Sequence, residues 1–139
     1  MNTRAYRIAD DIVAKCQGLR LLDATEVQQI TDAAASRFIK EKNHLWWWES
    51  LSKSAKTTRY DEGSFLEMMR DFLREKTGVL YLILTDDEFP PWCGISGEPE
   101  NILAAIRELP AIEFFLVPQD IEWIAFDTHH NELVIAGMK

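Results

Sequence analysis

The sequence has few of the features that hold secreted or membrane proteins together. It contains only two cysteines, Cys16 and Cys93, and they follow no spacing typical of a metal site or a redox motif. No run approaches the roughly 18 consecutive apolar residues that a membrane-spanning helix needs. Residues 1–16 also lack the uninterrupted apolar core of a signal peptide. These absences predict a cytoplasmic protein with reduced cysteines.

Signature motifs of enzymes are missing as well. The chain has no glycine-rich phosphate loop, no G-x-S-x-G and no H-E-x-x-H. Nothing in the sequence therefore favours an enzyme, and we expect no catalytic residue, no metal ion and no cofactor. The function has to be sought in the charge and the surface of the chain.

The charge is distributed unevenly. The net charge is −8, but residues 1–85 carry 12 acidic and 13 basic side chains, whereas residues 86–139 carry 11 acidic and only 2 basic ones. A negative field of this kind repels nucleic acid and anionic membranes and attracts cationic proteins. The acidic C-terminal part therefore indicates a docking surface for a cationic protein. The plain alternative is a charge that serves only solubility.

Four segments place apolar residues at helical spacing. They are residues 3–17, 23–42, 64–76 and 98–109. Thr3 can cap the first helix, Ser64 and Glu67 form a capping-box pattern at the start of the third, and Pro99 suits the first turn of the fourth. The first two segments together predict a helical hairpin.

The strands are predicted from shorter runs. Residues 79–84 are apolar on both faces, as in a central strand, and residues 52–60 could include a short edge strand. Three runs rich in β-branched and aromatic residues lie at 112–117, 121–126 and 132–136, with short turn-forming gaps between them. They predict a C-terminal β-meander, and residues 85–95 are expected to form a loop. The fold class is therefore α+β: one domain, 1–139, with helices packed on a four- to five-stranded antiparallel sheet that ends in the meander.

Three adjacent tryptophans, Trp46, Trp47 and Trp48, form the oddest stretch of the chain. Neighbouring side chains diverge by about 100° on a helix and 180° on a strand, so the three rings cannot all face one core. At least one should be partly exposed or packed under a loop. The run predicts either a plug at one end of the core or an aromatic contact patch for a partner.

Two clusters of ionisable residues could carry chemistry. Asp86, Asp87 and Glu88 follow the predicted central strand, where a hard cation could bind carboxylates. Asp127, His129 and His130 share one turn and could form an acid–base or metal site. The simpler interpretation is a solvated acidic loop and a polar turn. A small metal-dependent hydrolase or nuclease remains an alternative function.

Binding is the better supported class. An acidic rim around aromatic anchors suits an inhibitor of a basic enzyme, since carboxylates orient the partner and occupy a groove built for phosphates. The residues predicted to contact the partner are Asp86, Asp87, Glu88, Trp92, Glu98, Glu100, Asp120, Glu122, Asp127 and Glu132.

The C-terminal pattern also resembles a known group of proteins. The order is an aromatic strand (EFFLV), then DIEWI, the turn DTHHNE and a closing LVIAG, over residues 111–137. This pattern resembles small bacterial immunity proteins that accompany polymorphic or contact-dependent growth-inhibition toxins. The resemblance implies a compact acidic α+β domain that binds and blocks one toxin. At the positions of Trp123 and His130, it implies structural roles rather than functional ones.

The sequence thus predicts an immunity protein that occludes the active site of a cognate cationic toxin, expected to be a nuclease. It predicts no nucleic-acid or membrane partner and leaves the oligomeric state open. A third possibility, in which residues 46–48 are the contact patch of an adaptor or oligomerising module, stays open.

Overall fold

A computed structural model describes the chain except for residues 1–2, 42, 44, 87–88 and 138–139. Its helices are α1 (Arg4–Lys15), α2 (Ala24–Phe38), α3 (Phe65–Leu73) and α4 (Pro99–Glu108), with 3-10 turns η1 (Trp47–Glu49) and η2 (Glu62–Ser64). Its strands are β1 (Arg20–Leu21), β2 (Ala55–Arg59), β3 (Leu80–Leu84), β4 (Cys93–Gly97), β5 (Phe114–Pro118), β6 (Ile124–Thr128) and β7 (Glu132–Ala136). The predicted α+β class and the C-terminal meander of β5, β6 and β7 are confirmed.

The sheet has more strands than predicted. Seven antiparallel strands pair in the order β1-β4-β3-β5-β6-β7-β2. The additional strands are the two-residue β1 and β4, and the first three residues of β4 lie in the region 85–95 that was predicted to be a loop. All five residues of β4 are buried, and a Cβ added at Gly94 would come within 2.6 Å of Ile83 and 2.9 Å of Leu22. Glycine at this position allows close packing inside a strand. The prediction of a loop here was therefore wrong.

The meander also differs in its boundaries. Strand β6 begins at Ile124, three residues later than the predicted run, because Ile121 has a φ of +56° and cannot continue a strand. The last turn is tighter than predicted, with Asn131 at a φ of +56°. Asparagine tolerates this left-handed conformation better than most residues, so the turn is consistent with its sequence.

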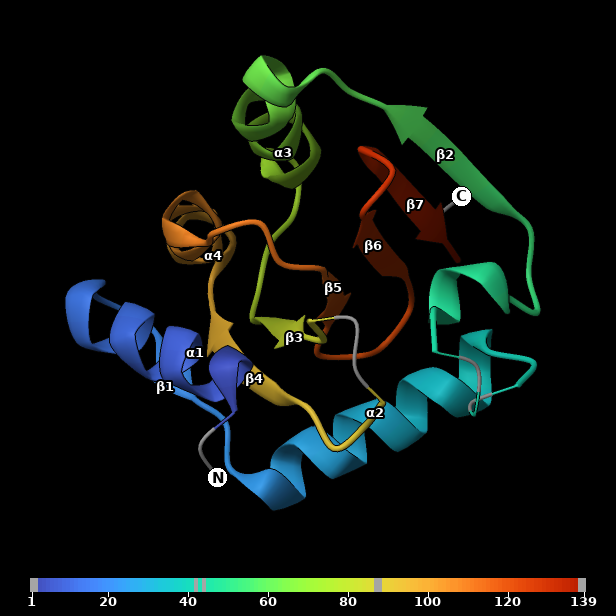
Figure 1. The fold of residues 1–139 in the computed structure, drawn as a ribbon, viewed down its shortest axis with the longest axis horizontal. Helices are drawn as coiled ribbons and strands as arrows, with labels where there is room; N and C mark the ends of the chain where they lie inside the picture. The colour runs from blue at the N-terminus through green and yellow to red at the C-terminus, as the bar shows by residue number, and fades with distance from the viewer. Residues whose placement is uncertain (1–2, 42, 44, 87–88, 138–139) are drawn as a thin grey trace.

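Helices cover both faces of the sheet, so the fold has three layers (Figure 1). One apolar cluster joins α1, α3 and α4 to the face formed by residues such as Leu82, Ile95 and Leu116. A second joins α2 and the turn η1 to the opposite face, where Ile83 and Phe115 lie. Successive residues of a strand point to opposite faces, so the central strands β3 and β5 are almost entirely apolar.

The helix starts follow the predicted signals in part. Thr3 accepts a hydrogen bond from the backbone N–H of Tyr6, as expected of a cap. The capping box predicted at Ser64 was wrong, because the 3-10 turn η2 precedes α3 and the Ser64 hydroxyl donates to the carbonyl of Asp61 at 3.0 Å. Across the described residues, no helix has both the length and the apolar content needed to cross a membrane.

Helix α2 has the complete capping box. Asp23 accepts a hydrogen bond from the backbone N–H of Glu26 at 2.8 Å, and the Glu26 carboxylate accepts one from the backbone N–H of Asp23 at 3.1 Å. We expect Asp23→Ala to lower the free energy of unfolding by about 1 kcal/mol, measured by urea denaturation. Asp23→Asn keeps an acceptor and serves as the control. Equal losses in both variants would show that the cap does not stabilise α2.

Candidate functional site

The strand register defines two opposite ends of the sheet. At one end, Leu84 pairs with both Cys93 and Phe114, and Phe114 pairs with Asp127. Strand β7 begins and strand β2 ends at this same end, just before Tyr60. We call it the Tyr60 end.

At the opposite end, Leu80 pairs with Gly97 and with Pro118. The start of α4 and the turn between β5 and β6 lie here, so we call it the Glu98 end. A strand of five residues is roughly 15 Å long, and this length separates the two ends.

The ten predicted contact residues do not gather on one surface. The Tyr60 end holds Asp86, Trp92, Asp127 and Glu132, and the Glu98 end holds Glu98, Glu100, Asp120 and Glu122. The remaining two, Asp87 and Glu88, lie outside the described residues. Trp92 is only 6% exposed and packs edge-on against Trp47, with ring centroids 4.9 Å apart. It belongs to the core.

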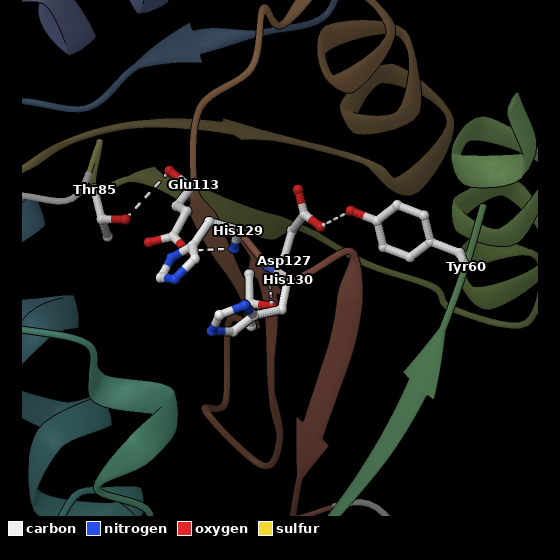
Figure 2. Close-up of polar contacts among 7 residues, drawn as sticks. Tyr60, Thr85, Glu113, Asp127, His129 and His130 are labelled. Carbon is white, nitrogen blue, oxygen red and sulfur yellow. Dashed lines mark hydrogen bonds and ion pairs between the residues drawn. The ribbon is translucent and has the colours of Figure 1, made fainter. Parts of the chain in front are cut away.

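A tyrosine–aspartate pair stands at the Tyr60 end (Figure 2). The Tyr60 hydroxyl donates to Asp127 Oδ1 at 2.5 Å and ties the end of β2 to β6. Burial raises the pKa of Asp127 to about 6, although the hydrogen bond from Tyr60 acts in the opposite direction. Burial, and then the hydrogen bond to Asp127, raises the pKa of Tyr60, so its hydroxyl keeps the proton.

A buried carboxylate lies beside this pair. Glu113 is 8% exposed, and its Oε2 accepts hydrogen bonds from the backbone N–H of His129 at 2.5 Å and from ring Nδ1 at 2.8 Å (Figure 2). An ionised carboxylate can only accept, so the Nδ1 that contacts it carries a proton, and Nε2 is an acceptor in the tautomer that has no second ring proton. The carbonyl of Glu113 in turn accepts from the Thr85 hydroxyl at 3.2 Å.

The two unusual motifs of the sequence meet here. The rings of Trp46 and Trp48 lie 5.0 and 5.6 Å from that of His129, and Trp48 also lies 5.5 Å from His130. Trp46 and Trp48 are partly exposed, which is one of the two expected outcomes, whereas Trp47 is 3% exposed and points into the core. The partly exposed tryptophans therefore support the histidine turn.

Two hollows open at this end. A pocket of about 380 Å³ is lined by Tyr60, Phe65, Asp86, residues 109–114, residues 127–129 and Asn131. Among these lining residues are three carboxylates and no lysine or arginine. A shallower groove of about 680 Å³, lined by residues of β2, η2 and α3 together with His130, shares Tyr60 and Asn131 with the pocket. The two hollows therefore adjoin each other.

The groove is also acidic on its far side. Its lining includes Asp61, Glu67 and Asp71, against one arginine, Arg59. Asp61 and Glu67 are exposed. Groove and pocket together form an acidic trough, by which we mean the surface from Asp71 across Tyr60 to Glu113.

Sequence comparison places the chain among related proteins. A family of unknown function, DUF6756, matches residues 7–139. The chain belongs to the DUF6756 family. No curated protein and no solved structure matches it. For this DUF6756 member, the residues of the site are therefore the guide to function.

Sequence reasoning missed two members of this DUF6756 site. Tyr60 lies 67 residues from Asp127, and no local pattern joins them. Glu113 left a weak signal, since it is the one charged residue in the apolar stretch 111–117. A charge in such a stretch is rarely buried without a partner, so its position indicates a polar partner inside the fold.

The alternative of a metal site gains no geometric support in the part of this DUF6756 chain that the structure describes. There, no group of three histidine, cysteine, aspartate or glutamate side chains is placed to hold a metal ion. The Asp127–His130 turn binds Tyr60 and Glu113 instead.

Proposed function

We propose that the protein is an inhibitor of a cationic protein and that it binds this partner in the acidic trough at the Tyr60 end. A bacterial toxin of the kind blocked by immunity proteins fits this role, in keeping with the resemblance of residues 111–137. The observation that carries the proposal is the pocket, in which three carboxylates and no lysine or arginine line a cavity of about 380 Å³. Such a cavity favours a cationic group.

The trough explains the recognition better than the whole acidic C-terminal half does. The carboxylates at the Glu98 end lie a strand length away, so one small contact cannot use both sets. The trough also adds acidic residues from the N-terminal half, namely Asp61, Glu67 and Asp71. An extended basic segment of a partner could follow the groove and end in the pocket.

Co-purification with matched charge reversals tests the proposal. Tagged protein is recovered from its native host at moderate and then high salt, alongside Asp61→Lys/Glu67→Lys and Glu98→Lys/Glu122→Lys. Both double variants change the net charge by the same amount, and they differ only in the end of the sheet at which the charges are reversed. We expect the wild type and the Glu98-end variant to retain one basic partner. The trough variant should associate with it at least about tenfold more slowly.

Growth of cells that express the recovered partner provides the functional readout. Wild-type protein should suppress the toxicity of the partner, and the trough variant should suppress it less. A partner lost only from the Glu98-end variant would move the binding surface to that end. Recovery of no partner under either wash would reject the inhibitor.

One observation favours a second function, a hydrolase. Glu113, which is buried, orients the His129 ring through Nδ1, and Asp127 lines the same pocket. In the tautomer with a single proton on Nδ1, Nε2 could accept a proton from water. Such a dyad could activate water. A panel of ester, phosphate and glycoside substrates would test it, with His129→Ala expected to abolish turnover and His130→Ala to retain it. Equal turnover in the two variants would reject His129 as the base.

A further inference from the structure

The pocket at the Tyr60 end combines two kinds of wall. Phe65, Ile112 and Phe114 supply apolar surface, and the Tyr60 and Phe65 rings lie 5.1 Å apart at the side of the cavity. The other wall holds the carboxylates of Glu113 and Asp127. Apolar walls with a few convergent polar groups are typical of a binding site for one specific side chain or small ligand.

We propose that this pocket receives the guanidinium group of an arginine side chain from the partner. The inference rests on the proposed function, because it supplies the anchor by which a cationic protein would be held. It specifies both the residue type that enters and the carboxylates that meet it.

The position of Asp127 is the first argument. Its Oδ1 accepts the Tyr60 hydroxyl, and its other oxygen points away from Tyr60 (Figure 2). Tyr60 therefore fixes the orientation of the carboxylate, and the second oxygen faces away from the tyrosine. Asp127 is partly buried, so its carboxylate has lost hydrogen bonds to water. A cation that donates hydrogen bonds would replace them.

The rim of the pocket already shows this chemistry. The guanidinium of Arg4 binds Asp86 Oδ1 at 2.5 Å, and Asp86 lines the pocket. This pair is exposed on the arginine side. Glu113 Oε2 is bonded to His129, so Asp127 is the carboxylate that we expect to meet a second cation. The chain thus pairs one of the three pocket carboxylates with an arginine of its own.

The aromatic wall favours arginine over lysine. A guanidinium is planar and weakly hydrated, so it can stack on a ring while its N–H groups reach a carboxylate. An ammonium is strongly hydrated and loses more on entering a partly apolar cavity. The rings of Tyr60 and Phe65 supply the surface on which a guanidinium could lie.

Small probes test the pocket without the partner. We would titrate the protein at pH 7.5, above the Asp127 pKa of about 6, with N-acetylarginine methylamide and follow backbone amide shifts by NMR. The controls are the citrulline analogue, which has the same shape without the charge, and the lysine analogue. We expect the arginine probe to shift resonances of Tyr60, Phe65 and Asn131 with a dissociation constant of roughly 1–10 mM. The citrulline probe should give no such shifts.

Two variants connect the shifts to the carboxylates. Asp127→Asn keeps an acceptor for Tyr60 but removes the charge, and it should weaken binding of the arginine probe at least fivefold. Asp86→Asn removes a carboxylate at the rim and should weaken binding less. Asp120→Asn, at the Glu98 end, should leave it unchanged. Thermal unfolding of each variant shows that the fold is intact before binding is compared.

The outcomes distinguish failure of the guanidinium pocket from failure of the proposed inhibitor function. Equal binding of citrulline, equal binding of lysine, or shifts confined to the Glu98 end would overturn the guanidinium pocket. If the arginine probe fails while the partner is still lost from the trough variant, the inhibitor stands without this anchor. If the probe binds as expected but no partner is recovered, the pocket stands and the proposed function falls.

Discussion

Replacing Trp47 by alanine is expected to lower the free energy of unfolding by about 3–5 kcal/mol, because a large buried ring would leave a cavity. Trp47 is 3% exposed, lies edge-on to Trp92 at 4.9 Å and stacks over Phe115 at 6.0 Å. It is the element through which the η1 turn closes one face of the sheet. Urea denaturation followed by far-ultraviolet circular dichroism measures the loss without relying on tryptophan fluorescence.

Trp47→Phe and Trp48→Ala are the matched variants. Phenylalanine keeps an aromatic ring in the cavity and should lose less stability than alanine, so it remains measurable if the alanine variant does not fold. Trp48 is partly exposed, and its truncation should have a smaller effect. Equal losses at positions 47 and 48 would contradict the assignment of Trp47 to the core.

Asp127→Asn is expected to change how stability depends on pH. The pKa of Asp127 is raised from 3.8 to about 6 in the folded protein, chiefly by burial. A raised carboxyl pKa favours folding most at low pH, and the benefit is lost as pH rises from about 4 through 6. Two pKa units correspond to about 3 kcal/mol, so the variant should gain roughly 2–3 kcal/mol relative to the wild type between pH 4 and pH 8.

Tyr60→Phe is the control variant, because Tyr60 is the residue that donates a hydrogen bond to Asp127. Tyr60 donates to it, and Asp86, Glu113 and His129 line the same pocket. Because the Tyr60 hydrogen bond lowers the pKa of Asp127, Tyr60→Phe should raise that pKa further and steepen the loss of stability with rising pH. Urea denaturation at pH 4, 6 and 8 measures both effects. A constant difference between Asp127→Asn and the wild type at all three pH values would show that Asp127 titrates alike in the folded and unfolded chain.

The fold was predictable where its pattern is local. The strands of the meander are separated by short turns, so alternation and turn chemistry were enough. Strand β4 was not predictable in this way, since its sequence CGISG contains two glycines and follows Pro90 and Pro91. It forms because β3 provides hydrogen bonds along its whole length and β1 covers its other edge. Only the tertiary structure provides these partners.

The site was predictable to a smaller extent, because most of its contacts also depend on the tertiary structure. The sequence predicts Asp127, His129 and His130 as one turn and the tryptophan run as a separate feature. Their contact, and the partners Tyr60 and Glu113, depend on how β2, β5 and β7 align in the sheet. The same register divides the acidic residues between the two ends of the sheet. The distribution of charge along the sequence does not predict this division.

The strand order has a consequence for synthesis. The five adjacent strands β4-β3-β5-β6-β7 all come from residues 80–136, whereas the outermost strands, β1 and β2, come from the N-terminal part. Strand β2 therefore leaves the ribosome well before β7, its pairing partner, and β1 well before β4. Helix α2 likewise has to wait for the face of the sheet on which it packs. Because the early half of the chain has nothing to pair with, we expect cooperative folding to begin only after Ala136 has emerged, and nascent chains stalled before β7 to be bound by chaperones.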